Sequence, residues 1–261
     1  MHLLNTATYQ LESVLHPKQY AILSHIWGYG EVTFDDMKDI SAASQKPGWE
    51  KIKNTCRLVV ERGIQYAWID TCCIDKSSSA ELSEAINSMF RWYKESTVCH
   101  VYLSGLNPVY PSDHTSDYPH PDAVIANHTM TNLHKCRWFT RGWTLQELIA
   151  PLKMAFYDKR WMYRGDKQDL VNLLTTITGI ESSILLDPML LPSIPVAKRM
   201  SWAANHQTTR AEDIAYSLMG IFDVNMPMIY GEGQKSFYAF KKRLPRASMT
   251  SPCLHGLIQL V

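Results

Sequence analysis

The sequence predicts an α/β fold, in which helices flank a mostly parallel sheet of four to five strands. The main observation is an alternation of short apolar runs with longer stretches of helical periodicity, which continues to about residue 195. Strands that alternate with helices form parallel sheets covered by helices. Beyond that point only helical patterns follow, so we expect an all-helical C-terminal extension over residues 196–244.

Each predicted element rests on a local pattern. The apolar runs with the length of buried strands are 20–26, 64–70, 98–105 and 153–158. Apolar residues at helical spacing predict helices over 49–60, 82–93, 169–177, 211–222 and 231–244. Gly63 stands where the first helix needs a C-cap. Ser78 and Glu81 fit a capping box at the start of the second.

These patterns also suggest how the chain is organised. We expect an N-terminal segment (1–19), an α/β core (20–195), the helical part (196–244) and a tail (245–261). Residues 107–135 carry four prolines and few apolar residues, which indicates a long loop inserted into the core.

Composition excludes several classes of protein. Lys and Arg number 26 against 25 Asp and Glu, so no charge bias indicates a nucleic-acid or anionic-membrane partner. No apolar run approaches the roughly 20 residues that span a bilayer, and the N-terminus does not resemble a signal peptide. The six cysteines fit neither a disulfide framework nor paired metal ligands, so we expect a cytoplasmic location and no metal.

The stretch RGWTLQELIAP (141–151) has an unusual helical pattern. Wound as a helix, it places Trp143 and Glu147 together on the side away from its other apolar residues. We interpret Glu147 as a carboxylate that faces a ligand, with Trp143 stacking beside it. Two alternatives remain open. Thr144 and Glu147 also fit a capping box, and Trp143 could simply pack against the 107–135 insertion.

Polar residues follow the predicted strands at their carboxyl ends, where parallel sheets bind ligands. Ser24, His25 and Trp27 follow the first strand, and Asp70 and Asp75 follow the second. We expect them to converge with Glu147 on one ligand, the aspartates by hydrogen bonding to a sugar. The alternative for both aspartates is a helix cap or a turn.

A different site chemistry is also open. Cys72, Cys73 or Ser24 could act as a nucleophile with His25 as its base. No G-x-S-x-G elbow or known cysteine signature supports this hydrolase alternative.

Four stretches together resemble the HET (heterokaryon incompatibility) domain of filamentous fungi. They are YAILSHIWGYGEVTFDDM (20–37), YAWIDTCCIDKSSSAELSEAINSMFRWYKESTVCHVYLS (66–104), CRWFTRGWTLQELIAP (136–151) and TTRAEDIAYSLMGIFDVNMPMIYGEG (208–233). The resemblance implies a cytosolic protein of fungal innate immunity that triggers programmed cell death when non-self is detected. It also implies an upstream non-self sensor as a partner, and self-association.

HET domains are in turn remotely similar to TIR domains. The TIR pattern has a strand that ends in a Ser-containing loop, as YAILSHIWG does, and a Trp followed by Glu-Leu, as WTLQEL does. This similarity implies that Glu147 serves in cleaving NAD between nicotinamide and ribose. Asp70 and Ser24 would then bind ribose or phosphate, and Trp27 and Trp143 would shape the base pocket. The alternative within the family is a non-enzymatic module that signals by self-assembly.

Overall fold

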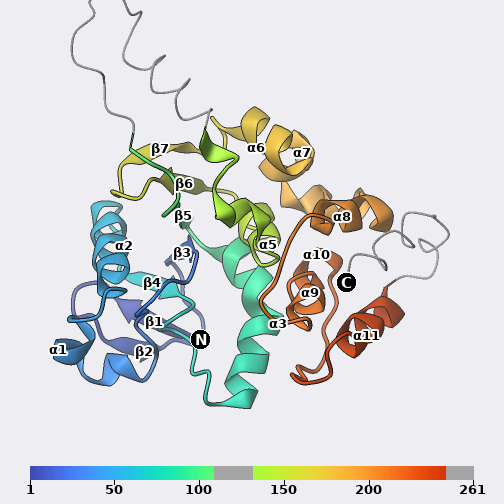
Figure 1. Ribbon diagram of the computed structural model, residues 1–261. Coiled ribbons are helices and arrows are strands. Elements are labelled where there is room, and N and C mark those ends of the chain that lie inside the picture. Colours follow the sequence, from blue (N-terminus) through green and yellow to red (C-terminus); the bar gives the residue numbers. More distant parts are fainter. Residues whose placement is uncertain (109–131, 245–261) are drawn as a thin grey trace, which may run out of the picture.

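The computed structural model describes residues 1–108 and 132–244, which form one mixed seven-stranded sheet with helices packed around it (Figure 1). The strand order is β2-β1-β4-β3-β5-β6-β7. The predicted α/β class with a parallel centre is confirmed, but the sheet has seven strands rather than four or five. Most of the loop predicted over 107–135 and the whole tail 245–261 lie outside the described residues.

Four parallel strands make the centre of the sheet. They are β3 (Ala21–His25), β4 (Tyr66–Ile69), β5 (Val98–Tyr102) and β6 (Met154–Tyr157). Strand β3 pairs with β4 on one side and with β5 on the other, and all five of its residues are buried. The chain thus runs from β3 outward to β4 and returns to β5, which places a topological switch point between β3 and β5. Ligands of such sheets bind beyond the carboxyl ends of the strands at this point.

Antiparallel strands that the sequence did not reveal close both edges. Strands β1 (His2–Asn5) and β2 (Leu11–Ser13) form a hairpin, and β1 also pairs with β4. At the opposite edge, β7 (Tyr163–Asp166) pairs with β6. Each has three or four residues, which is too short for an alternation of apolar and polar residues to stand out. The N-terminal segment 1–19 therefore contributes two strands to the sheet.

Helices cover both faces of the sheet (Figure 1). On one face lies α2 (Trp49–Glu61), which Gly63 ends with a left-handed φ of 70°. On the other lie α3 (Ser79–Glu95) and α5 (Thr144–Ile149). The Ser78 side chain caps α3 by accepting a hydrogen bond from the Glu81 amide, as the sequence predicts. Three short helices connect these parts: η1 (Asp36–Lys38), α1 (Ile40–Ala43) and η2 (Arg137–Thr140).

Residues 171–244 contain helices joined by loops. They are α6 (Val171–Thr178), α7 (Ser182–Leu186), η3 (Pro188–Ser193), α8 (Val196–Ala203), α9 (Asp213–Tyr216), α10 (Met219–Phe222) and α11 (Lys235–Arg243). The continuous helix predicted over 211–222 is wrong, because the chain breaks into α9 and α10 between Tyr216 and Met219. Helix α10 packs on α3, where Gly220 lies directly against Phe90. One isolated bridge joins Gln207 to Arg141 just before α5.

Within the two described ranges, every helix is too short or too polar to cross a lipid bilayer.

Candidate functional site

Glu147 is buried at the centre of the candidate site, with 4% of its surface exposed. Its Oε2 accepts a 2.5 Å hydrogen bond from Ser24 Oγ at the end of β3. The capping-box alternative for Glu147 is wrong. Trp143 is the N-cap of α5 and makes no capping bond through its side chain, while the Thr144 hydroxyl donates to the Trp138 carbonyl. The carboxylate is therefore directed to the end of the parallel sheet.

Trp138 is the second partner of Ser24. Its Nε1 donates a 2.8 Å hydrogen bond to Ser24 Oγ, so the serine hydroxyl accepts from the indole and donates to the carboxylate. The Trp138 side chain is fully buried and meets Phe139 and Phe156 edge to face. These contacts hold the indole in one position, because a well-packed aromatic ring cannot rotate without disturbing its neighbours.

Arg141 provides positive charge beside Glu147. Its Nη1 donates a 2.7 Å hydrogen bond to the His25 carbonyl and lies 4.0 Å from Glu147 Oε1. Burial raises the pKa of Glu147, while the Arg141 charge and the Ser24 hydrogen bond oppose that rise. Burial is the larger effect, since a carboxylate in a low-dielectric environment loses its hydration. The Glu147 carboxyl is therefore easier to protonate than an exposed glutamate.

A second acidic group lies beside the first, at the end of β4. Asp70 Oδ2 accepts a 2.8 Å hydrogen bond from Trp27 Nε1, and Oδ1 lies 3.3 Å from His25 Nε2. That second approach is poorly aligned, so neither His25 ring nitrogen nor Asp70 Oδ1 completes a hydrogen bond within the described chain. Burial opposes ionisation of Asp70, but the contact with His25 and the charges of Lys76 and Arg141 lower its pKa to about 2.

The structure thus brings together five of the seven predicted site residues, namely Ser24, His25, Trp27, Asp70 and Glu147. Asp75 lies apart, in the turn before α3, where its carboxylate accepts from the amide and hydroxyl of Ser77. Trp143 hydrogen-bonds to Asp213 of α9 through its side chain. Its backbone oxygen accepts a hydrogen bond from the Glu147 amide.

The hydrolase alternative finds no nucleophile paired with a base among the described residues. Cys72 and Cys73 are buried, and their thiols contact the carbonyls of Ile69 and Ala67. Hydrogen bonding to Cys73 and burial raise the pKa of Cys72 well above its ordinary value, which keeps the reactive thiolate scarce. The Ser24 hydroxyl donates to Glu147, and neither ring nitrogen of His25 has a hydrogen-bond partner among the described residues.

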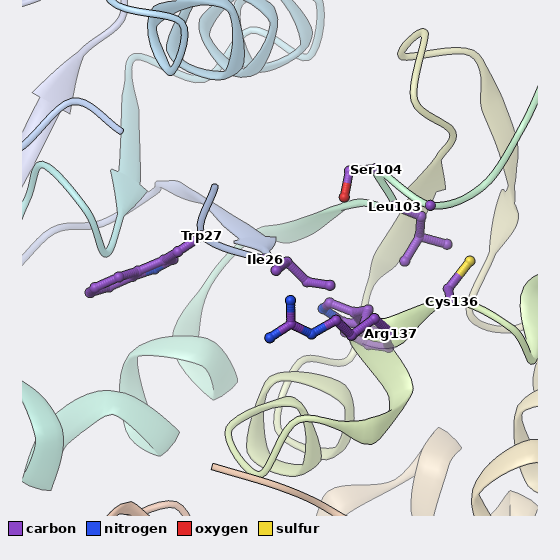
Figure 2. A pocket seen from close by; sticks show the side chains of 8 residues that line it. Ile26, Trp27, Leu103, Ser104, Cys136 and Arg137 are labelled. Carbon is purple, nitrogen blue, oxygen red and sulfur yellow. The ribbon is translucent and has the colours of Figure 1, made fainter. Parts of the chain in front are cut away.

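A pocket of about 240 Å³ opens at the switch point between β3 and β5 (Figure 2). Its wall comes from the segments that follow these two strands and from the start of η2: Ile26, Trp27, Leu103, Ser104, Gly105, Cys136, Arg137 and Trp138. Glu147 is outside this lining. Trp138 lines the pocket and also bonds to Ser24, so its indole separates the pocket from the Glu147 carboxylate.

Sequence reasoning missed Trp138 in this region, and it treated Arg137 and Arg141 only as candidate phosphate-binding arginines whose spacing is not diagnostic. All three stand in CRWFTRGW, the segment that leads into the glutamate helix. A segment that leads directly into a helix at the end of a sheet must itself lie near that end. Its position in the sequence could therefore have placed these residues at the site. No group of three or more His, Cys, Asp or Glu side chains has a metal-binding arrangement in the part of the chain that the structure describes.

Comparisons with known proteins agree with the sequence patterns. Residues 20–147 match the family model described as heterokaryon incompatibility protein (HET). The chain is also 45% identical over 240 residues to vegetative incompatibility protein HET-E-1 of Podospora anserina, an alignment that covers 91% of this chain and 17% of that relative. No solved structure shows a significant match to the chain. The matched segment contains β3, β4, β5 and the start of α5 with Glu147, the parts that build the site, and the chain belongs to the heterokaryon incompatibility (HET) family.

Proposed function

We propose that this chain is a vegetative incompatibility effector that triggers programmed cell death by hydrolysing NAD or a related nucleotide. Its family and the name of its relative support the first part of the proposal. The observation that carries the second part is the buried Glu147 carboxylate, held by Ser24 one indole ring away from a pocket at the switch point.

The reaction is hydrolysis of the bond between nicotinamide nitrogen and ribose carbon. Water supplies the hydroxyl group, and the products are free nicotinamide, ADP-ribose and a proton. Positive charge develops on the ribose as this bond breaks, and a nearby carboxylate stabilises that charge. Glu147 supplies the carboxylate, whose effect is strong because its surroundings exclude water.

Access to Glu147 requires Trp138 to move. With Glu147 only 4% exposed, a ribose in the pocket meets the indole before it meets the carboxylate. Opening breaks the bond from Trp138 Nε1 to Ser24 Oγ and leaves the Ser24–Glu147 pair facing the pocket. The arrangement with Trp138 bonded to Ser24 is the closed state in this proposal. A closed state suits a toxic activity that must stay off until it is needed.

We propose that clustering of the chain by an upstream non-self sensor drives this opening. The chain spans 17% of the length of the relative it matches, so other parts of such a protein can carry the sensing role.

A second candidate is a non-enzymatic module that kills by assembling with itself or with partners. The burial of Glu147 behind Trp138 favours it, because the carboxylate then serves only to join α5 to β3.

Expression in fungal cells separates the two candidates when viability and cellular NAD are measured together. The wild type should kill and deplete NAD, whereas Glu147→Gln should do neither. Glu84→Gln, which changes an exposed glutamate of α3, is the matched control and should behave as the wild type. Killing without NAD loss, retained in Glu147→Gln, would select the assembly module and end the catalytic proposal.

A further inference from the structure

Two polar side chains of the pocket have no partner among the described residues. Arg137 is exposed at the first position of η2, and no described residue hydrogen-bonds or ion-pairs with its guanidinium. Ser104, which follows β5, is exposed as well and its hydroxyl has no such partner. Figure 2 shows the two side chains on opposite sides of the pocket, which places a cation and a hydroxyl donor around one space.

The charge of the lining selects an anion. Arg137 is the one charged residue of the lining, and no carboxylate stands among the eight residues that form it. A guanidinium presents several N–H donors in a plane and matches the oxygen atoms of a phosphate. The nearby acid Asp70, at the end of β4, is not part of this lining, and its Oδ2 accepts a hydrogen bond from Trp27 Nε1.

The remaining wall is apolar and has room. The half-buried Ile26 and the exposed Trp27 provide surface for the carbon-rich part of a ligand, while Leu103 and Trp138 are buried in the wall. There is free space at Gly105, since a β-carbon added there would meet only the Cys136 α-carbon, 4.0 Å away. The volume of about 240 Å³ is below the roughly 300–1,000 Å³ of sites that enclose a drug-sized molecule. One nucleoside phosphate therefore fits this pocket better than a whole dinucleotide.

We infer that the pocket binds a nucleoside 5′-phosphate unit, with Arg137 pairing with the phosphate and Ser104 donating a hydrogen bond to it. The apolar wall takes the ring or the sugar of that unit. This assignment deepens the proposed function and rests on it for the identity of the substrate, because it places one half of NAD in the pocket. Arg137 is then the specificity-determining residue that distinguishes a nucleotide from its parent nucleoside.

Calorimetric titration of purified protein tests this assignment. The probes are AMP, nicotinamide mononucleotide, their two parent nucleosides and inorganic phosphate. We expect the two nucleotides to bind at least about tenfold more tightly than the nucleosides, a difference of about 1.4 kcal/mol. Arg137→Gln should remove this advantage, and Gly105→Val should weaken every organic probe by filling the pocket. Arg57→Gln, which changes an exposed ion pair on α2, is the control and should bind as the wild type.

The outcomes for the pocket and for the catalytic proposal are distinguishable. Equal affinity of Arg137→Gln and wild type for AMP would overturn the phosphate assignment, and so would nucleosides that bind as tightly as nucleotides. Binding of inorganic phosphate alone, with no preference for nucleotides, would overturn it too. If Arg137→Gln hydrolyses NAD at the wild-type rate, the phosphate assignment of Arg137 is contradicted, whereas the catalytic proposal for Glu147 is not. Arg137-dependent binding of AMP without any NAD turnover supports the inference and contradicts the catalytic proposal. Thermal melting of each variant confirms that it is folded.

Discussion

Ser24 Oγ lies 2.5 Å from Glu147 Oε2, a hydrogen bond that joins two residues 123 positions apart in the chain. It ties the end of the central strand β3 to the helix that precedes β6. The same hydroxyl accepts from Trp138 Nε1, so one serine holds both the carboxylate and the indole that separates it from the pocket. A substitution at Ser24 therefore removes a hydrogen-bond partner from Glu147 and from Trp138 at the same time.

Ser24→Ala should destabilise the fold by about 1–3 kcal/mol. The substitution leaves a buried carboxylate oxygen and a buried indole N–H without their partner, and each loses its hydrogen bond without regaining water. Urea denaturation measures the loss. Ser44→Ala is the control, because Ser44 is only half-buried and its hydroxyl bonds to the Ser41 carbonyl and the exposed Gln45 amide of its own turn. A Ser24→Ala protein as stable as this control would show that the contact carries no energy.

Glu147→Gln should change how stability depends on pH. Burial raises the pKa of Glu147 above its unfolded value of 4.5, so the folded state binds the proton more tightly than the unfolded state does. The stability linked to this group is full below that value and is lost as the pH rises through the folded pKa. Relative to Glu147→Gln, the wild type should therefore lose unfolding free energy as the pH rises from 4.5 through the raised folded pKa. Unfolding curves of equal pH dependence would contradict this expectation.

Lys167→Met should reveal a pH dependence of the opposite sign. Lys167 is 1% exposed and donates to the carbonyls of Pro151 and Ile149, just after α5. Burial lowers its pKa from 10.5 to about 7. A group whose folded pKa is lowered stabilises above its unfolded pKa and loses that stability as the pH falls through the folded one. The wild type should gain unfolding free energy relative to Lys167→Met as the pH rises from about 7 to 10.5, and parallel curves would contradict this expectation.

Gly220→Ala tests how the C-terminal helices dock on the α/β core. A β-carbon at Gly220 would lie 2.1 Å from the Phe90 β-carbon, so α10 must move away from α3. We expect a loss of about 1–3 kcal/mol or more from overpacking, measured by thermal or urea unfolding. Gly105→Ala is the matched control, since its added β-carbon has an ordinary contact and should cost little. Equal stability of the two variants would mean that α10 and α3 pack differently from the arrangement described.

The rule that ligands gather at strand ends predicted much of the site. It brought Ser24, His25 and Asp70 together, and the parallel strands explain why, since their carboxyl ends share one edge. The helical projection of Trp143 and Glu147 was less informative. It predicted that the two side chains leave the helix on the same side, but it did not predict which residues they contact. In the structure the Trp143 side chain bonds with Asp213 of the C-terminal helices.

The missed features depend on contacts that one sequence does not display. Three-residue strands such as β2 are specified by pairing with a neighbour and not by their own pattern. The break between α9 and α10 falls inside an apolar stripe of helical spacing, and the docking of α10 on α3 shows only in the folded chain. Trp138 belongs to the site because it meets Ser24, which is 114 positions away.

The most direct test of the central claim is release of nicotinamide from NAD by the purified chain. The release is measured over a range of protein concentrations and also with artificially clustered protein. The account predicts that the wild type and Glu84→Gln hydrolyse NAD at the same rate, each releasing one ADP-ribose for every nicotinamide. The rate of Glu147→Gln should be lower by a factor of at least about 100, as it is when a charge-stabilising group is removed from an active site. Glu147→Gln that releases nicotinamide at the wild-type rate, or clustered wild type that releases none, would contradict it.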